Sequence, residues 1–238
     1  MKRKADPGVG PDAIMAMIPS DLDFLVKTSH AQKVPLFDMN FYHLYQCRAK
    51  LGTKALLTLL GPFLGAPQAV MAMEKMIALG AKRIWVLGWC GSLQPNLRIG
   101  DLVIPTGAIC EEGTSQHYPI GKKNPETDAE LNLMLEEALK EKGQTFVRGT
   151  VWTTDAPYRE TPLKVKTYQG KEVLAVEMEM SALMTLATYR GVKLAGLLVI
   201  ADELFDLKWH SGFRNPKLKK TSRSAGKLLL DVVESLSR

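Results

Sequence analysis

The chain lacks the features on which small disulfide-rich or metal-stabilised domains depend. Its 238 residues include only three cysteines, and Cys47, Cys90 and Cys110 show no C-x-x-C spacing. Neither a disulfide framework nor a zinc cluster is therefore indicated. With 19 glycines, 13 prolines and 46% apolar residues, the composition is not that of a disordered or collagen-like chain. We expect one soluble domain in a reducing cytoplasm.

Long hydrophobic runs are also missing. The longest uncharged stretch, 55–73, contains glycine, proline and glutamine residues that would interrupt a membrane-spanning helix. The basic N-terminus is not followed by an apolar segment, so it is not predicted to be a secretory signal. We expect residues 1–12 to form a flexible arm, residues 13–238 to form the domain, and no membrane partner.

Positive charge is concentrated at one end of the chain. The net charge is +6, and residues 214–238 hold seven basic and two acidic side chains, so this segment alone carries +5. The rest of the chain is nearly neutral, which argues against a broad nucleic-acid-binding surface. The pattern predicts a C-terminal helix with a solvated basic face and no nucleic-acid partner.

Hydrophobic patterning predicts an α/β fold, because short runs rich in Val, Ile and Leu alternate with longer amphipathic stretches. Strands are expected at 56–60, 84–87, 102–105, 108–110, 145–153, 172–176 and 194–200, and helices at 67–79, 128–142, 178–189 and 219–236. The segment 88–92 is predicted to be a glycine-punctuated turn at the carboxyl end of a strand. Open α/β sheets bind their ligands at that end.

Common catalytic motifs are absent, including GxxxxGK[ST], GxSxG, HExxH and GxGxxG. The four histidines are scattered without metal-ligand spacing, so no metal site is expected.

Acidic residues interrupt the apolar pattern at two places. Glu177 and Glu179 flank Met178 where a buried strand meets the start of a helix. Acidic residues in a first helical turn also complement the helix dipole, so both a structural and a functional interpretation stay open. Asp202 ends the most hydrophobic strand, where burial would raise its pKa and keep it available as a proton donor, and a turn cap is the alternative.

An ordered series of motifs runs from about residue 56 to residue 213. It comprises GAP at 65–67, VLGWCGSLQ at 86–94, IGDLV at 99–103, VEME at 176–179 and AD at 201–202. In this order the motifs resemble the nucleoside phosphorylase family, which includes purine nucleoside and uridine phosphorylases. The resemblance implies a single-domain α/β fold with a twisted mixed β-sheet flanked by helices. It also implies a homo-oligomer, as a dimer, trimer or hexamer, that cleaves the N-glycosidic bond of a small-molecule nucleoside.

The resemblance also implies roles for individual residues. Glu179 would accept hydrogen bonds from the ribose 2′- and 3′-hydroxyls, because the two oxygens of a carboxylate can serve vicinal hydroxyls. Asp202 would protonate or hydrogen-bond N7 of a departing purine, and its presence resembles the purine-type enzymes. The other residues expected to bind substrate are Met178, Glu177, Gly88, Trp89, Cys90 and Tyr158. Met178 would pack on the sugar, and Tyr158 would either stack on the base or be an ordinary surface-loop tyrosine.

The chain departs from the family where the resemblance places phosphate. Ser20 and Phe24 stand in place of a glycine and an arginine, and Tyr42 and Val86 in place of two more arginines. Trp89 replaces a small hydroxyl residue. A dianion needs charge-assisted donors, so the phosphate pocket is predicted to be filled or rebuilt.

Three hypotheses follow from these departures. The first is phosphorolysis, with inorganic phosphate as co-substrate and Arg98, Arg148 or Arg159 supplying the charge. The second is hydrolysis by water, with Asp21 or Asp23 as the base. The third is nucleoside binding without catalysis. No metal or organic cofactor is implied.

Overall fold

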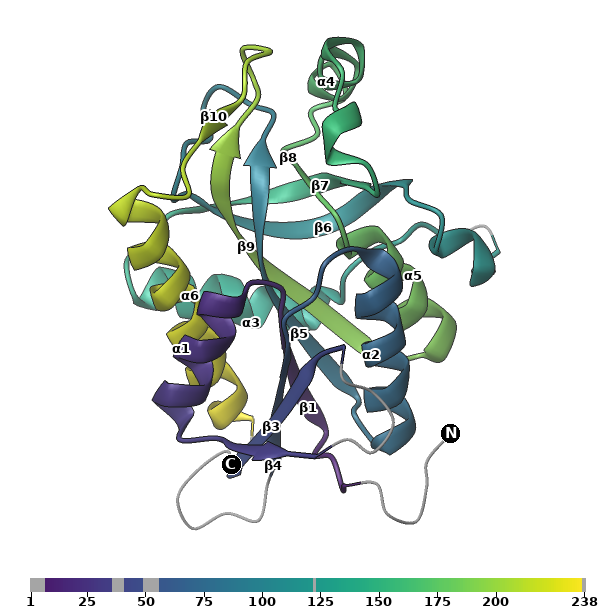
Figure 1. The fold of residues 1–238 in the computed structure, drawn as a ribbon, viewed down its shortest axis with the longest axis vertical. Helices are drawn as coiled ribbons and strands as arrows, with labels where there is room; N and C mark the ends of the chain where they lie inside the picture. Colours follow the sequence, from purple (N-terminus) through teal and green to yellow (C-terminus); the bar gives the residue numbers. More distant parts are fainter. Residues whose placement is uncertain (1–6, 36–40, 49–55, 122, 237–238) are drawn as a thin grey trace.

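A mixed β-sheet forms the centre of the structure, a computed structural model that describes residues 7–35, 41–48, 56–121 and 123–236 (Figure 1). The strands are β1 (Asp12–Ala16), β2 (Gln32–Val34), β3 (His43–Arg48), β4 (Leu56–Gly61), β5 (Arg83–Ser92), β6 (Leu102–Glu111), β7 (Phe146–Thr154), β8 (Ala175–Glu177), β9 (Lys193–Glu203) and β10 (His210–Ser211). The helices are α1 (Pro19–Ser29), α2 (Ala66–Leu79), α3 (Ala129–Glu141), α4 (Pro162–Gln169), α5 (Met180–Arg190) and α6 (Pro216–Ser235). Two short 3₁₀ helices are η1 (Ser115–His117) and η2 (Pro157–Arg159).

The sheet is partly closed on itself. Its strand order is β10-β9-β6-β7-β8-β5-β1-β4-β3-β2, and β9 also pairs with β5. The strands β9, β6, β7, β8 and β5 therefore form a ring. At its carboxyl end β5 runs between β8, which is antiparallel to it, and β9, which is parallel to it. Gly91 consequently pairs with Val176 on one side and with Asp202 on the other.

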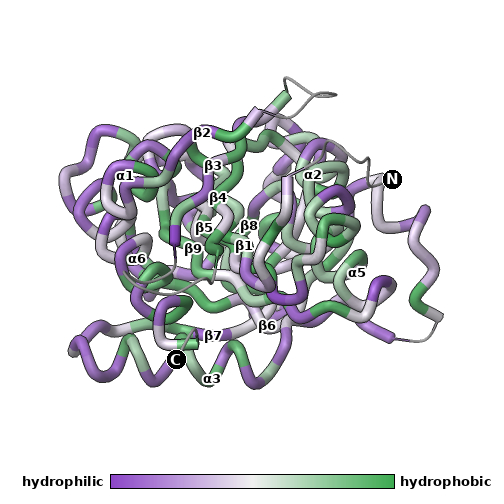
Figure 2. Tube along the Cα trace, turned by 90° about the horizontal axis from the view of Figure 1, so that it is seen from below, coloured by the Kyte–Doolittle hydropathy of each residue, from purple (hydrophilic) through white to green (hydrophobic). Residues whose placement is uncertain are grey.

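Helices cover both faces of the sheet. Figures 1 and 2 show α2 and α5 on one side, and α1, α3 and α6 on the other. Alternate side chains of β1 pack against the helices on opposite faces of the sheet. Ala13 and Met15 pack with α2 and α5, whereas Ile14 packs with α1 and α6. Figure 2 shows hydrophobic residues along the central strands and mostly hydrophilic ones on the outer side of α3. This two-layer burial is the pattern expected of an α/β domain.

Several predicted boundaries of strands and helices were wrong, and the largest difference is at residues 88–92. This segment is not a turn, because β5 continues through it to Ser92 and has hydrogen-bonded neighbours on both sides. The strands predicted at 102–105 and 108–110 are one strand, β6, with an irregular register between Pro105 and Gly107. Ser20 and Phe24, at positions where the resemblance places phosphate, lie in helix α1, which begins at Pro19.

The N-terminal arm lies partly outside the described residues, which begin at residue 7. The part that is described is anchored to the sheet at its end. The Pro11 carbonyl accepts hydrogen bonds from the N–H groups of Lys82 and Arg83, at 2.8 and 2.9 Å. Asp12, expected in the arm, is buried in β1 and forms a 2.6 Å ion pair with Arg83.

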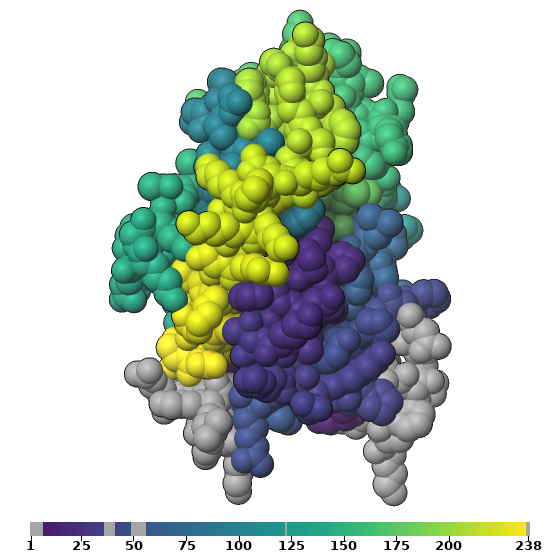
Figure 3. Space-filling model, turned by 60° about the vertical axis from the view of Figure 1, so that its left-hand side comes forward, coloured from purple at the N-terminus to yellow at the C-terminus, as the bar shows by residue number. Residues whose placement is uncertain are grey.

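The C-terminal helix α6 lies beside α1, as Figure 3 shows with the yellow and purple segments in contact. One face of α6 is buried through residues such as Leu218, Ala225 and Leu229, and its lysines are exposed. Among the described residues, no helix is long and apolar enough to cross a membrane.

Candidate functional site

The predicted acidic residues gather around the carboxyl end of β5. Glu177 ends β8 and Asp202 lies near the end of β9, so the ring of strands brings them to opposite sides of Gly91. The Cys90 side chain is buried beside both of them. Its thiol pKa is raised well above the usual range by burial, and the nearby charges of Asp202 and Glu177 add to the shift. At neutral pH Cys90 is a neutral group in the wall of the site.

Glu177 directs its carboxylate toward backbone N–H groups. Its Oε2 accepts from the N–H groups of Glu179 and Met180, at 2.6 and 2.7 Å, and its Oε1 accepts from the Thr153 hydroxyl. Burial raises its pKa, and these three donors oppose the shift. Glu177 therefore fixes the start of α5 and the backbone of Glu179, which agrees with the interpretation as a first-turn acid. A contact with substrate stays a prediction.

Glu179 lies where the loop before α2 meets the start of α5. Its side chain is buried, and Oε1 accepts from the Gly65 N–H at 2.6 Å. Gly65 has a φ of +85°, a conformation that favours glycine. Burial and the neighbouring Glu177 raise the pKa of Glu179 to about 8. Met178, between the two glutamates, is partly exposed.

Asp202 is held by an indole. Trp209, on the segment between β9 and β10, donates its Nε1–H to Oδ2 of Asp202 at 2.9 Å. A side chain at position 91 would not fit, because a Cβ on Gly91 would lie 2.9 Å from the same oxygen. Burial raises the pKa of Asp202, the Trp209 N–H opposes the shift, and the charge of Glu203 adds to it. The raised pKa agrees with the expectation from the sequence, and the role of Asp202 as a proton donor stays a prediction.

Glu160, which follows η2, is a second carboxyl group close to Asp202. Its pKa is raised to about 7 by burial and by the charge of Asp202. Neither Glu160 nor Trp209 was identified from the sequence. Glu160 lies in a loop without hydrophobic pattern, and Trp209 is 61% exposed, so no local signal marks them as site residues.

Trp89 points away from Cys90, toward the layer of α1 and α6. Its Nε1–H donates to Oγ of Ser222 at 3.1 Å, and that hydroxyl donates to Oδ2 of Asp21 at 2.7 Å. The indole also stacks on Phe213 at a centroid distance of 5.9 Å. Asp21 is buried, and its pKa is raised by that burial. Trp89 and Ser222 thus fill the space between β5, α1 and α6.

The positions expected to bind phosphate are largely apolar. Val86 is fully buried, and Tyr42 is buried with a hydroxyl that has no hydrogen-bond partner within the described ranges. Burial raises the pKa of Tyr42 to about 12. One cation stands nearby, because the Arg223 guanidinium of α6 lies 5.7 Å from the centre of the Phe24 ring and also acts on Asp21. No sequence pattern distinguishes Arg223 from the other basic residues of the C-terminal segment.

Two arginines proposed to replace the missing ones are engaged elsewhere. Arg98 pairs with Glu203 at 3.0 Å and Arg148 with Glu136 at 2.8 Å. Tyr158, on η2, is 99% exposed and has no aromatic partner in the described part of the chain. Its role in stacking on a base stays a prediction.

An apolar groove of about 680 Å³ lies next to the first half of α2. It is lined by Pro67, Val70, Met71, Glu74, Gly113, Thr114, Gln116, His117, Tyr118 and Asp155. Hydrogen bonds connect the segment before η1 to Glu177, since Glu112 accepts from the Ser181 hydroxyl and the Ser181 N–H donates to Thr153. The groove is therefore coupled to the carboxylate cluster by buried polar groups.

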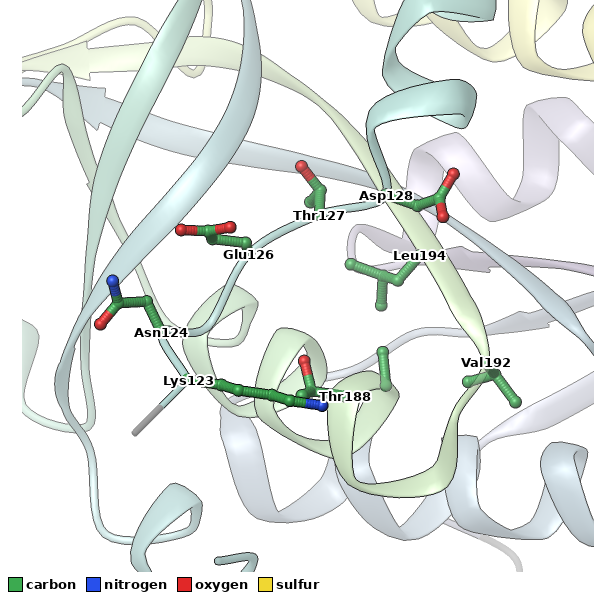
Figure 4. A pocket seen from close by; sticks show the side chains of 9 residues that line it. Lys123, Asn124, Glu126, Thr127, Asp128, Thr188, Val192 and Leu194 are labelled. Atoms are coloured by element: carbon green, nitrogen blue, oxygen red, sulfur yellow. The ribbon is translucent and has the colours of Figure 1, made fainter. Parts of the chain in front are cut away.

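A separate polar cavity of about 470 Å³ lies between the segment before α3 and the end of α5 (Figure 4). Figure 4 shows Lys123 extending toward Thr188 across its floor. None of the predicted site residues lines this cavity. Where the chain is described, no group of three or more His, Cys, Asp or Glu side chains is arranged to hold a metal ion.

Solved structures share this fold over nearly the whole chain. Purine nucleoside phosphorylase from Toxoplasma gondii, in complex with immucillin-H, superposes with a TM-score of 0.87 at 23% identity, covering 100% of this chain and 98% of that one. Uridine phosphorylase from Vibrio fischeri superposes with a TM-score of 0.82 at 21% identity, covering 94% and 92%. The expected single-domain mixed α/β fold is confirmed.

The sequence model of the phosphorylase superfamily matches residues 11–237, and the chain therefore belongs to that superfamily. Guanosine phosphorylase from Halorubrum lacusprofundi is 31% identical over 146 residues, which are 61% of this chain and 60% of that protein. Purine nucleoside phosphorylase DeoD-type from Bacillus cytotoxicus is 31% identical over 147 residues, 61% of this chain and 63% of that protein. The matches thus span about three fifths of these relatives.

Proposed function

We propose that the chain cleaves the N-glycosidic bond of a purine nucleoside and transfers the ribosyl group to inorganic phosphate. The observation that carries the proposal is the placement of Glu177 and Asp202 on opposite sides of Gly91 at the carboxyl end of β5, with Glu179 positioned by Glu177, in a chain of the phosphorylase superfamily. The relatives named as guanosine and purine nucleoside phosphorylases support the same reaction.

The two carboxyl groups suit the two ends of the bond. As C1′–N9 breaks, positive charge develops on the sugar and the bonding electron pair moves to the base. Glu179 offers its carboxyl oxygens as hydrogen-bond acceptors to the ribose hydroxyls, which holds the sugar in place as the bond breaks. Asp202 in its acid form gives its proton to N7 of the leaving purine, and a phosphate oxygen forms the new bond to C1′.

Phosphate requires a cation, and Arg223 supports its binding beside α1. Its guanidinium lies over Phe24, the residue that replaces an arginine of the family pattern. A guanidinium supplied by α6 instead of α1 would give the dianion charge-assisted donors.

Hydrolysis is the second candidate, and the Trp89–Ser222–Asp21 chain favours it. An indole and its hydrogen-bonded hydroxyl occupy the place that the resemblance gives to phosphate. Water needs less room and no cation, so attack by water on C1′ is compatible with this packing.

One experiment separates these functions. Base release is measured from purine, pyrimidine and 5′-modified nucleosides with and without inorganic phosphate, and the sugar product is identified. We expect release that requires phosphate and yields ribose 1-phosphate. Release of free ribose without phosphate would establish hydrolysis, and binding without release of any base would contradict both enzymatic candidates.

A further inference from the structure

We propose that Trp209 and Phe213 form a subsite for an aromatic substituent at position 6 of the purine. The inference extends the proposed function and rests on it, because the proposed function places the base at Asp202. It starts from two large aromatic side chains beside the predicted proton donor that cleavage of the N-glycosidic bond itself does not require. Trp209 is 61% exposed and Phe213 is 55% exposed.

A short hairpin holds the two aromatic side chains at the candidate site. β10 pairs with the end of β9, so that Ser211 lies opposite Asp202. Directly after β10, the Gly212 N–H donates to the carbonyl of Ala201 at 2.8 Å. A Cβ on Gly212 would clash with the same oxygen, so only glycine allows the chain to approach β9 this closely. This approach fixes the segment on which both aromatic side chains stand.

Contacts between rings orient the exposed side chains. The Trp209 Nε1–H donates to Oδ2 of Asp202 at 2.9 Å, and the edge of the indole meets Phe213 at a centroid distance of 6.0 Å and an interplanar angle of 62°. Phe213 in turn stacks on Trp89 at 5.9 Å and 20°. The three rings form a row that begins at Asp202 and ends on β5. A surface held in this way loses little conformational entropy when a ligand binds to it.

The hydrogen bond from Trp209 determines which part of a bound base meets the row. Trp209 occupies Oδ2 of Asp202, so a purine N7 is left with the other carboxyl oxygen. N7 and the group at position 6 share one edge of a purine. Position 8 adjoins the atom that bears the sugar, whereas a group at position 6 points away from the sugar. A substituent at position 6 is therefore the part of the ligand that reaches the Trp209 ring.

The exposed rings also define the chemistry of that substituent. The indole N–H is the one polar group of the two side chains, and it is already bonded to Asp202. What the rings offer to a ligand is therefore apolar and aromatic surface. An aromatic group gains from both burial and ring–ring contact on such a surface. The benzyl group of N6-benzyladenine has this chemistry, whereas adenine has no group that reaches the row.

The test uses adenine and N6-benzyladenine, which are free bases with no glycosidic bond to cleave. Their dissociation constants are measured by calorimetry for the parent and for Trp209→Leu, Trp209→Phe and Phe213→Leu. The control is Tyr189→Leu, which alters an exposed aromatic side chain near the end of α5. We expect the parent and the control to bind N6-benzyladenine about tenfold more tightly than adenine.

The two substitutions of Trp209 separate the ring from its hydrogen bond. Both remove the donor to Asp202, which affects the two bases alike, but only Trp209→Phe keeps an aromatic ring. Trp209→Leu and Phe213→Leu should bring the ratio of the two dissociation constants within about threefold of one, whereas Trp209→Phe should keep most of the parent's preference. Melting temperatures verify that each variant is folded.

A parent that binds both bases equally, or binds neither, overturns the proposal, and so does a Trp209→Leu variant with the parent's ratio. Leucine variants that change the sedimentation of the protein but not the ratio would assign the rings to a contact between copies, which also overturns it. Cleavage of adenosine and N6-benzyladenosine is assayed separately. Cleavage by a parent without the preference refutes only this inference, and preferential binding of N6-benzyladenine without cleavage of either nucleoside refutes only the proposed activity.

Discussion

Glu177 and Glu179 are only two residues apart, yet the structure gives their carboxylates different partners. Glu177 accepts from the backbone at the start of α5, whereas Glu179 reaches across to the loop before α2. The spacing of the two glutamates indicated that acidic groups were important here. It did not separate the helix-positioning residue from the sugar-binding candidate, because that distinction depends on the Gly65 loop.

Replacing Glu179 by Gln tests the sugar-binding role. The amide oxygen can still accept from the Gly65 N–H, so the loop should hold, but an NH₂ donor replaces the second carboxyl oxygen offered to the ribose hydroxyls. We expect kcat/KM for the nucleoside that the parent cleaves best to fall on the order of 10²-fold. Unchanged steady-state kinetics, with an unchanged melting temperature, would remove Glu179 from the site.

The Trp209→Phe substitution tests whether the Trp209 N–H controls the pKa of Asp202. The substitution keeps an aromatic ring but removes the N–H that stabilises the ionised form of Asp202. The pKa of Asp202 should therefore rise further, and more of the acid form should persist at alkaline pH. We expect the alkaline limb of the kcat/KM profile to move to higher pH. If the alkaline limb of the kcat/KM profile stays in place or moves to lower pH, Asp202 is not the acid whose pKa Trp209 controls.

At the scale of elements, β5 shows why residues 88–92 were predicted to be a turn and are in fact part of a strand. Gly88 and Gly91 suggested a turn, but in the fold they leave room for neighbours. A Cβ at Gly88 would lie 3.1 Å from the Leu198 side chain, and one at Gly91 would meet Asp202. The sequence pattern singled out this segment because glycine marks a place where neighbouring groups approach the backbone closely. It did not show the strand, since only pairing with β8 and β9 reveals it.

Residues that act through tertiary contacts were the ones missed. Glu160, Trp209 and Arg223 reach Asp202 or Phe24 from three other segments of the chain. Each carries a residue type that is common on surfaces, so its role depends on packing that no local pattern encodes. Asp202 and Glu179 could be selected from the sequence as candidates because a charged residue next to a buried strand is itself a local signal.

The junction of α1 and α6 gives a prediction about stability. Asp21 is buried there with a raised pKa, so the folded state holds a proton that the unfolded state releases. The free energy of unfolding should therefore decrease as the pH rises from acid through the raised pKa. Asp21→Asn keeps the acceptor for Ser222 and should flatten this slope, with a higher melting temperature than the parent near neutral pH. Asp23→Asn, on an exposed position of α1, is the matched control. An equal slope in parent and Asp21→Asn would contradict the prediction.

At the scale of the whole molecule, exposed apolar side chains lie near the start of α2, and one of them, Met71, lines the groove beside it. Leu64 is 78% exposed and Met71 39% exposed, and Phe41 is tied to this region because its carbonyl accepts from Gln68 of α2. Large exposed apolar groups around one groove are typical of a surface that associates with another protein. They support the expectation of a homo-oligomer.

Leu64→Asp tests that expectation. A charge on this surface should weaken association because it would be desolvated at the interface. We expect sedimentation velocity to show an oligomer for the parent and a shift toward monomer for the variant. Leu163→Asp, which alters an exposed leucine of α4, is the control and should sediment like the parent. A monomeric parent would refute the expectation.

The closed ring of strands also governs how the sheet meets its surroundings. Among the described strands, the two at the ends of the strand order are β2 and β10, with only three and two residues. Such short borders offer little backbone for a foreign strand to extend. At high concentration the folded chain should therefore resist growth into cross-β fibrils.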